Sequence, residues 1–251
     1  MSDQNSPPPP VRPQPFTAQV SQHILLAGKY QYIFFEFLNP HRLQFQAGQY
    51  VLMTIPGIDK KYSYSIASPP AKDHGMDVLV DISPGGPGSQ YLKSLKPGDQ
   101  VSFLAPVGQF VLADPNSDIG KKEAKLVFVA TGSGISAIRS MILDRLEDKS
   151  DYRPMTLHWG LRYADEVFWH EDFRMLHDDF GNFTYDLVLS RPPTDWPLCH
   201  GRVTDCLVEH HQDFSNTGYY LCGNKTMIEQ VTNILLDKGV DKAHIHSEKF
   251  Y

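Results

Sequence analysis

The chain has 251 residues, of which 41% are hydrophobic and 12% aromatic, and this is enough apolar material for two medium-sized domains. Its formal net charge of −6 argues against general nucleic-acid binding, and no apolar run approaches the roughly 18 residues that a membrane span needs. The first residues contain no signal peptide, so we expect a cytoplasmic protein without a membrane partner.

The N-terminal half reads as a proline-rich tail followed by β-structure. Residues 1–15 include six prolines and predict a flexible tail. From 16 to 112, short segments rich in Val, Ile, Tyr and Phe alternate with turn residues, which is typical of an antiparallel β-barrel or sandwich. One helix is expected within residues 88–99, with Ser89 as its N-cap.

The C-terminal half has a different pattern. Residues 113–124 read as a linker, and from 125 to 251 apolar strands alternate with amphipathic helices, which predicts an α/β domain with an open parallel sheet. The charge divides at the same place, because residues 1–112 hold 8 Lys and Arg against 7 Asp and Glu, whereas residues 113–251 hold 15 against 22. We therefore expect two domains with different surfaces.

Glycines and polar residues follow the predicted strands of the second half. Thr131, Gly132 and Gly134 lie between a strand and a helix, where glycine lets the backbone approach a ligand and the helix N-terminus attracts phosphate. A plain tight turn is the alternative. Open α/β sheets bind ligands at the carboxyl ends of their strands. The candidates at the other strand ends are Arg162, Ser190, Arg191, Cys222 and Gly223.

The three cysteines are an odd number in a long chain and predict free thiols. They are too few for an iron–sulfur cluster with four thiolate ligands. A second group of residues is a candidate zinc site because its members are close in the sequence: Cys199, His200, Cys206, His210 and His211. Their spacing matches no zinc pattern, so we expect no bound metal.

Five motifs occur in a characteristic order: "YSYSIAS" at 62–68, "GGPGSQYL" at 85–92, "TGSGIS" at 131–136, "CGN" at 222–224 and "EKFY" at 248–251. Over residues 16–251 this order resembles the ferredoxin–NADP reductase family of flavoenzymes. The acidic-x-aromatic-aromatic end is most similar to the bacterial ferredoxin (flavodoxin)–NADP reductases. The resemblance implies FAD on the β-barrel, NADPH or NADH on the α/β domain, and hydride transfer from the nicotinamide to the flavin.

The resemblance also implies roles for residues of the barrel. Tyr64 and Ser65 stand where the family's Tyr-Ser pair contacts the isoalloxazine ring, so the tyrosine ring would stack and the hydroxyls would bond the ring's polar edge. Gly86, Gly88 and Ser89 match the start of the helix that holds the flavin's phosphate through its N–H groups.

Three residues are implied to act at the nicotinamide. Ser65, Cys222 and Glu248 would hold its reactive carbon close to the flavin, which is a gain in proximity rather than in acid–base power. Phe250 would cover the flavin until the nicotinamide displaces it, and Tyr251 would extend that cover.

The nucleotide phosphates need cationic or hydroxyl partners in the α/β domain. Arg162, Ser190, Arg191 and Arg202 are placed for them, and the arginines would suit the 2′-phosphate of NADPH. We therefore favour NADPH over NADH. The alternative is that each arginine pairs with a surface carboxylate, as Arg162 could with Asp165.

Two positions depart from the family pattern. The family has arginine two residues before Tyr64, where this chain has Tyr62, and the neighbouring Lys61 should point to the opposite face of the strand. The flavin phosphate would then be held more weakly or by another residue. At Ala137 the family commonly has proline.

Three functions follow from these features. The first is an FAD-dependent NAD(P)H oxidoreductase, expected to be a monomer, that passes electrons to a separate ferredoxin or flavodoxin. The second is a flavin reductase with exchangeable flavin, which the missing arginine favours. The third is a non-catalytic subunit that docks a partner enzyme.

Overall fold

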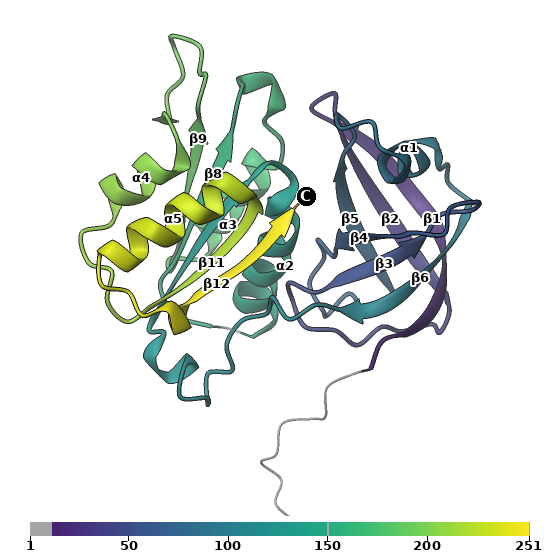
Figure 1. The fold of residues 1–251 in the computed structure, drawn as a ribbon, viewed down its shortest axis with the longest axis horizontal. Helices are drawn as coiled ribbons and strands as arrows, with labels where there is room; N and C mark the ends of the chain where they lie inside the picture. The colour runs from purple at the N-terminus through teal and green to yellow at the C-terminus, as the bar shows by residue number, and fades with distance from the viewer. Residues whose placement is uncertain (1–11, 150, 251) are drawn as a thin grey trace, which may run out of the picture.

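A computed structural model describes residues 12–149 and 151–250 of the chain. In this part of the chain a six-stranded antiparallel sheet is followed by a six-stranded parallel sheet, as Figure 1 shows. The predicted fold class, a β-barrel followed by an open parallel α/β sheet, is confirmed. Most of the expected tail at residues 1–15 falls outside the described residues, and the first strand begins at Gln14.

The barrel is one continuous sheet with the strand order β4-β3-β6-β1-β2-β5. Its strands are β1 (Gln14–Leu26), β2 (Tyr30–Asn39), β3 (Tyr50–Thr54), β4 (Lys61–Ser65), β5 (Gly75–Asp81) and β6 (Gln100–Val107). A bridge between Ile66, just after β4, and Val78 of β5 joins the two edge strands and closes the sheet.

The barrel helix α1 (Pro87–Ser94) begins earlier than the sequence predicts. Its N-cap is Gly86, and Pro87 takes the first helical position, where a missing N–H costs nothing. Ser89 therefore lies in the first turn, and its hydroxyl donates to the carbonyl of Gly86 at 2.9 Å. The expectation that Ser89 caps the helix is wrong.

The parallel sheet has the order β10-β9-β8-β7-β11-β12. Its strands are β7 (Lys125–Thr131), β8 (Met155–Leu161), β9 (Phe183–Leu189), β10 (Cys199–His200), β11 (Thr217–Asn224) and β12 (Ile245–Phe250). The helices are α2 (Ile135–Leu143), α3 (His170–Asp179), α4 (Val203–His210) and α5 (Lys225–Asp237). The short helical turns are η1 (Gly120–Lys122), η2 (Gly132–Gly134), η3 (Asp144–Asp148), η4 (Ala164–Glu166) and η5 (Lys242–His244).

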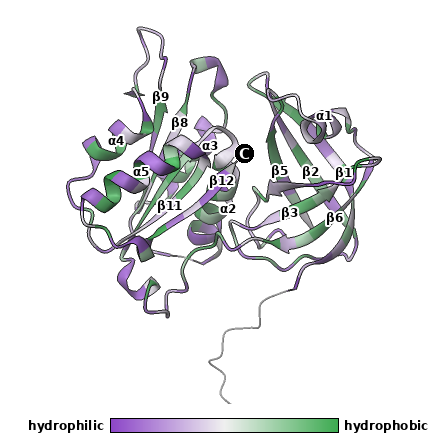
Figure 2. Ribbon diagram, in the orientation of Figure 1, coloured by the Kyte–Doolittle hydropathy of each residue, from purple (hydrophilic) through white to green (hydrophobic). Residues whose placement is uncertain are grey.

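Side-chain alternation along the strands places helices on both faces of this sheet. Phe128 of β7 belongs to a core with α2 and α3, whereas its neighbour Val129 packs with α4 and α5. Figure 2 shows hydrophobic residues concentrated on the strands and hydrophilic residues on the connecting loops. None of the helices within residues 12–149 and 151–250 has the length and apolar character needed to cross a bilayer.

The two sheets share a packed boundary. Tyr30 of β2 packs against Phe168 with ring centroids 4.6 Å apart, and Tyr32 packs against Trp169 at 5.0 Å. The buried hydroxyl of Ser140 on α2 donates to the carbonyl of Ser68 at 2.7 Å. These contacts fix the barrel against the α/β half, so a site can be built between them.

Candidate active site

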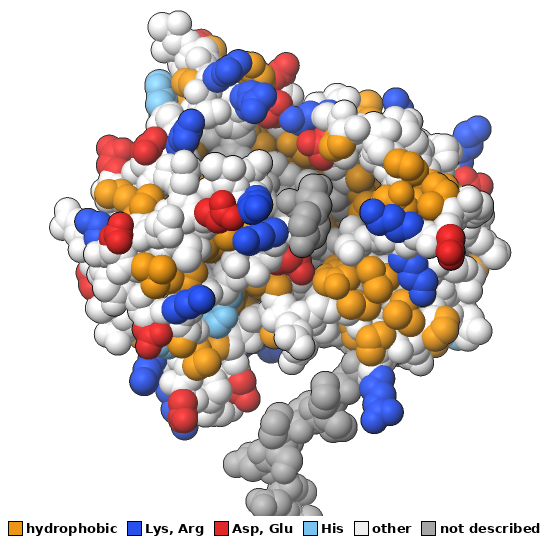
Figure 3. All heavy atoms as spheres, viewed as in Figure 1, with side chains coloured by type: hydrophobic (Ala, Val, Ile, Leu, Met, Phe, Trp, Pro, Cys, Tyr) orange, Lys and Arg blue, Asp and Glu red, His pale blue; other side chains and the backbone are white. Residues whose placement is uncertain are grey.

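A cleft of about 990 Å³ opens at the carboxyl ends of the parallel strands, and residues of the barrel, among them Lys29, Tyr30 and Asp81, form its other wall. Figure 3 shows the groove between the two halves, with Lys and Arg side chains along its upper rim. Eight residues that the sequence proposed for cofactor binding line this cleft: Thr131, Gly132, Gly134, Arg162, Ser190, Arg191, Arg202 and Gly223. The cleft lies where the strand order reverses between β7 and β11, which is the ligand-binding position of open α/β sheets.

The glycines at the ends of β7 and β11 leave the backbone there uncovered by side chains. A side chain on Gly134 would clash with the carbonyl of Cys222, and one on Gly223, which has a φ of +139°, would clash with Thr131. Thr131 Oγ1 also accepts from the N–H of Asn224 at 3.0 Å. The ends of β7 and β11 are thus held together, and the open backbone suits a dinucleotide that must approach it closely.

The three cleft arginines do not behave alike. In the described part of the chain none of them forms an ion pair with a carboxylate, so the alternative pairing of Arg162 with Asp165 is absent. Arg191 donates to the hydroxyl of Tyr163 at 2.8 Å. Its guanidinium also lies 5.8 Å from that ring's centroid, so the group is already oriented. Unpaired guanidinium groups in a cleft are suited to phosphate.

The barrel places the other predicted residues on a separate surface beside the cleft. Tyr62 and Tyr64 of β4 are half-buried, and both contact Gly88 of α1, where a side chain would clash with the two rings. Lys61 is exposed on the opposite face of β4, as alternation predicts, because the pairing of β3 with β4 contains no bulge. The ammonium of Lys60, by contrast, lies over the Tyr62 ring at 5.4 Å from its centroid.

The start of α1 has no side-chain cap. Its N-cap Gly86 has no side chain that could accept from the N–H groups of the first turn. In Figure 3, hydrophobic side chains gather on the barrel around α1 and β3. Apolar surface next to an uncapped helix N-terminus fits a flat aromatic group that carries a phosphate.

The three residues proposed to act at the nicotinamide come together. Ser65 Oγ of β4 lies 3.5 Å from Glu248 Oε2 of β12, and Cys222 is the partner of Glu248 in the pairing of β11 with β12. Burial raises the pKa of Glu248 to about 7, although the Ser65 hydrogen bond lowers it. Complete burial also raises the pKa of the Cys222 thiol, so it stays protonated and is no nucleophile.

The chain end is described only in part. Phe250 is the last residue of β12, and its backbone pairs with Asn224 of β11. Tyr251 lies outside the described residues.

Sequence reasoning missed several residues of the site. Lys29 of the barrel forms an ion pair with Glu166 at 2.7 Å, and both line the cleft. Tyr50 of β3 lies near Glu248, and burial together with that carboxylate raises its pKa. Lys29 and Glu166 are 137 residues apart, and nothing in the local pattern joins them.

The known proteins that this chain resembles are oxidoreductases. A family model described as an oxidoreductase FAD-binding domain matches residues 17–112, and one described as an oxidoreductase NAD-binding domain matches residues 128–233. The chain is 35% identical to the reductase component of phenol 2-monooxygenase from Pseudomonas sp. over 83% of its own length and 58% of that protein. It is 34% identical to one subunit of the Na(+)-translocating NADH-quinone reductase from Neisseria meningitidis, over 74% of its own length and 44% of that protein.

The chain therefore spans only about half the length of these relatives, 58% of the first and 44% of the second. Among solved structures, a cytochrome P450 reductase from Amycolatopsis superposes with a TM-score of 0.87 and 26% identity, over 95% of this chain and 70% of that one. A ferredoxin NADP+ reductase from Neisseria gonorrhoeae with bound FAD and NADP shares the fold, with a TM-score of 0.75, 18% identity, and coverage of 96% and 100%. The chain belongs to the ferredoxin reductase-like family of oxidoreductases, with an FAD-binding domain followed by an NAD-binding domain.

Proposed function

We propose that the chain takes hydride from a nicotinamide nucleotide onto bound FAD and passes the electrons to a separate ferredoxin or flavodoxin. The meeting of Ser65, Cys222 and Glu248, where the barrel faces the ends of β11 and β12, carries the proposal. We assign the flavin to residues 16–112 and the nucleotide to residues 125–251, joined by the linker 113–124. When bound, these cofactors supply the redox chemistry.

The protein residues then supply position and polarity. The Ser65 hydroxyl donates a hydrogen bond to Glu248 Oε2, and this contact spans the boundary between the two halves. Burial raises the pKa of the Glu248 carboxyl to about 7, so both of its protonation states are accessible near neutral pH. The buried Cys222 thiol fills space beside it and keeps water out. We propose that Thr131, Gly132 and Gly134 hold the nucleotide's pyrophosphate.

The bound flavin and its electron donor can be tested together. We expect the purified protein to show flavin absorbance bands, and we expect NADPH added anaerobically to bleach them faster than NADH does. The bleached protein should then reduce an added ferredoxin or flavodoxin. The reductase proposal fails if a flavin-loaded protein is not reduced by either nucleotide.

A second function, a flavin reductase with exchangeable flavin, is favoured by Tyr62 in the position of the family's arginine. A colourless protein that turns over added FAD would support it. Lys60, which lies over the Tyr62 ring, is a cation that could replace the arginine. A colourless protein that oxidises neither nucleotide would leave only the docking role.

The names of similar proteins suggest a further electron acceptor for this proposal. Two of them are named as reductase components or reductases of oxygenases, so an oxygenase component is a further acceptor to test beside ferredoxin and flavodoxin. We also propose a monomer in the cytoplasm.

A further inference from the structure

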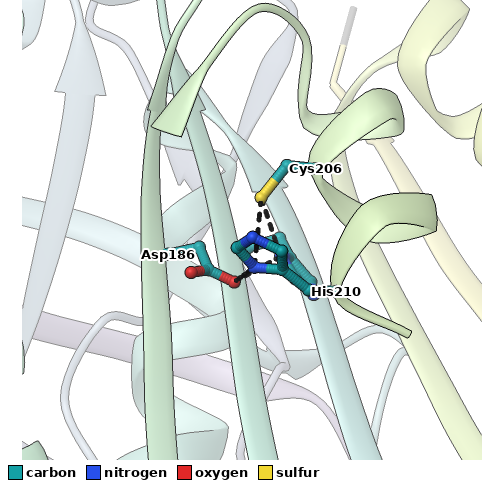
Figure 4. Close-up of side chains that lie close together, drawn as sticks. Asp186, Cys206 and His210 are labelled. Atoms are coloured by element: carbon teal, nitrogen blue, oxygen red, sulfur yellow. Dashed lines mark hydrogen bonds and ion pairs between the residues drawn. The ribbon is translucent and has the colours of Figure 1, made fainter. Parts of the chain in front are cut away.

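A cluster of four side chains of metal-binding types lies on the α4 side of the parallel sheet, away from the barrel. His158 comes from β8, Asp186 from β9, and Cys206 and His210 from α4. One ligand atom of each residue lies within 4.8 Å of those of the other three. Figure 4 shows Cys206, His210 and Asp186 converging in the space between α4 and the strands.

The spacing of the ligand atoms is close to that of a tetrahedral zinc site. With Zn–N of about 2.0 Å and Zn–S of about 2.3 Å, adjacent ligand atoms are expected about 3.3 to 3.6 Å apart. Asp186 Oδ2 lies 3.0 Å from His158 Nδ1 and 2.8 Å from His210 Nδ1. Cys206 Sγ lies 3.4 Å from the first nitrogen and 3.9 Å from the second. For these four pairs, shifts of about half an ångström or less would give the zinc spacing, and the other two pairs lie within 4.8 Å.

The surroundings also suit an ion. His158 and Cys206 are buried, whereas Asp186 and His210 are partly exposed and leave an entry path. The Asp186 carboxylate lies within hydrogen-bond distance of both His158 Nδ1 and His210 Nδ1, so it faces the centre of the cluster. One thiolate and one carboxylate would neutralise a divalent cation, which removes the cost of an unpaired buried charge.

His211 supplies the outer partner that a ligating histidine normally has. Its Nε2 lies 2.8 Å from Nε2 of His158. When Nδ1 of His158 binds the ion, Nε2–H donates to His211 and fixes the ring orientation. The Cys206 thiol releases its proton to solvent on binding, because only the thiolate coordinates.

We propose that His158, Asp186, Cys206 and His210 bind one zinc ion that ties α4 to β8 and β9. Two imidazoles, a thiolate and a carboxylate select zinc over magnesium or calcium, which prefer oxygen ligands. From the sequence we expected no metal at Cys206 and His210, because the spacing there matches no zinc pattern. His158 and Asp186 were not among the candidates, since they lie 48 and 20 residues before Cys206. The first residues of α4, Val203 and Thr204, line the nucleotide cleft, so the ion would brace one wall of it.

The first test is metal content. The flavin-loaded protein is purified with zinc in the growth medium, kept reduced, dialysed exhaustively, and analysed by plasma mass spectrometry. We expect about one zinc per chain, and less than a tenth of that in Cys206→Ala and in His210→Ala. His210 is partly exposed, so its variant should fold, which the flavin absorbance and circular dichroism verify.

His200→Ala is the matched control. His200 precedes α4, and its ring Nε2 lies 2.9 Å from the carbonyl of Trp196 and outside the cluster, so its variant should keep the zinc. Cys199→Ala should keep it as well, since this thiol lies at the edge of the cluster, 3.8 Å from Asp186 Oδ1. Cobalt(II) added to the metal-free protein should give a thiolate charge-transfer band and tetrahedral bands at longer wavelength than the flavin, both lost in Cys206→Ala.

Two results would overturn the proposal. A wild-type protein that retains no zinc and gives no cobalt bands would make the cluster a hydrogen-bond network alone. Zinc retained equally by wild type, Cys206→Ala and His210→Ala would place the ion elsewhere. Neither readout depends on oxidoreductase activity, so both results are independent of the proposed function.

Discussion

Glu248 shows how a single residue acquires unusual chemistry from its surroundings. In the sequence it is one acidic residue among 29, close to the end of the chain. In the structure it is largely enclosed between β11 and the barrel and has one hydrogen-bond donor, Ser65. Burial without a cationic partner disfavours the carboxylate, and this raises its pKa to about 7.

Replacement of Glu248 by Gln should change how stability depends on pH. The folded protein holds the Glu248 proton up to a pKa of about 7, whereas the unfolded chain releases it near 4.5. The wild type therefore loses stability as pH rises from about 4.5 to 7, by up to about 3 kcal/mol, and the loss is complete above that range. Glu248→Gln should lack this loss, and urea unfolding of both proteins between pH 5 and 8 measures the difference. A difference that stays constant with pH would contradict the raised pKa.

Gly134 shows the opposite case, a residue defined by the absence of a side chain. Gly134→Ala should destabilise the protein by about 1–3 kcal/mol and weaken nucleotide binding, since the new Cβ would push η2 away from the Cys222 carbonyl. Gly134 has a φ of −58°, so the effect would be steric and not conformational. Gly181→Ala is the control, because no atom lies within 4 Å of its added Cβ. Equal thermal unfolding midpoints for the two variants would refute the close approach.

At the scale of elements, the site is made by strand ends. The loops after β8, β9 and β10 place Arg162, Arg191 and Arg202 on one side of the cleft, and the turn after β7 closes it. Each arginine follows a strand of the same parallel sheet, and the carboxyl ends of parallel strands meet at one edge. Three arginines that are far apart in the sequence therefore lie together at one edge of the sheet.

Arg191→Ala and Arg202→Ala should each raise the KM for NADPH about tenfold or more and change the KM for NADH little. The reason is that a charged hydrogen bond to the 2′-phosphate is worth about 1.5–3 kcal/mol, and NADH lacks that phosphate. Steady-state kinetics with both nucleotides measures the effect. Arg174→Ala is the control, because Arg174 lies on α3 in ion pairs with Glu171 and Asp178. An unchanged KM for NADPH in both cleft variants would remove the preference for NADPH.

At the scale of the whole molecule, the site depends on the boundary between the barrel and the α/β half. Ser65 comes from one and Glu248 from the other, so their separation is set by the contacts around them. Those contacts include the ion pair of Lys29 with Glu166 and the hydrogen bond from Arg139 Nη1 to the Ala67 carbonyl at 3.0 Å. Loosening the boundary should therefore affect catalysis without touching a cofactor.

Ser140→Ala tests this link. The variant leaves the Ser68 carbonyl without its buried donor, which should cost about 1–2 kcal/mol in urea unfolding and lower the rate of flavin reduction. Ser136→Ala is the control on the same helix, because that hydroxyl bonds only the Ser133 carbonyl of its own turn. If Ser136→Ala slowed flavin reduction as much as Ser140→Ala, the boundary would not be the cause.

Much of this protein could be predicted from local pattern. Alternating Val, Ile, Tyr and Phe segments predicted the barrel, and strands alternating with helices predicted the parallel sheet, because hydrophobic period reports secondary structure directly. Thr131, Gly132, Gly134 and Gly223 were placed at the cleft by the rule for strand ends. The start of α1 was missed, since proline's preference for the first helical position outweighed the serine cap.

By itself the sequence determined the order of the elements, the motifs of the flavin and nucleotide halves and the free thiols, all of which depend on residues close together in the chain. Only the tertiary structure decided that Ser65 meets Glu248, that Lys29 meets Glu166, and that His158 and Asp186 join Cys206 and His210. These contacts join residues 20 or more positions apart. Their distances arise from strand order and helix packing, and hydrophobic period does not encode them.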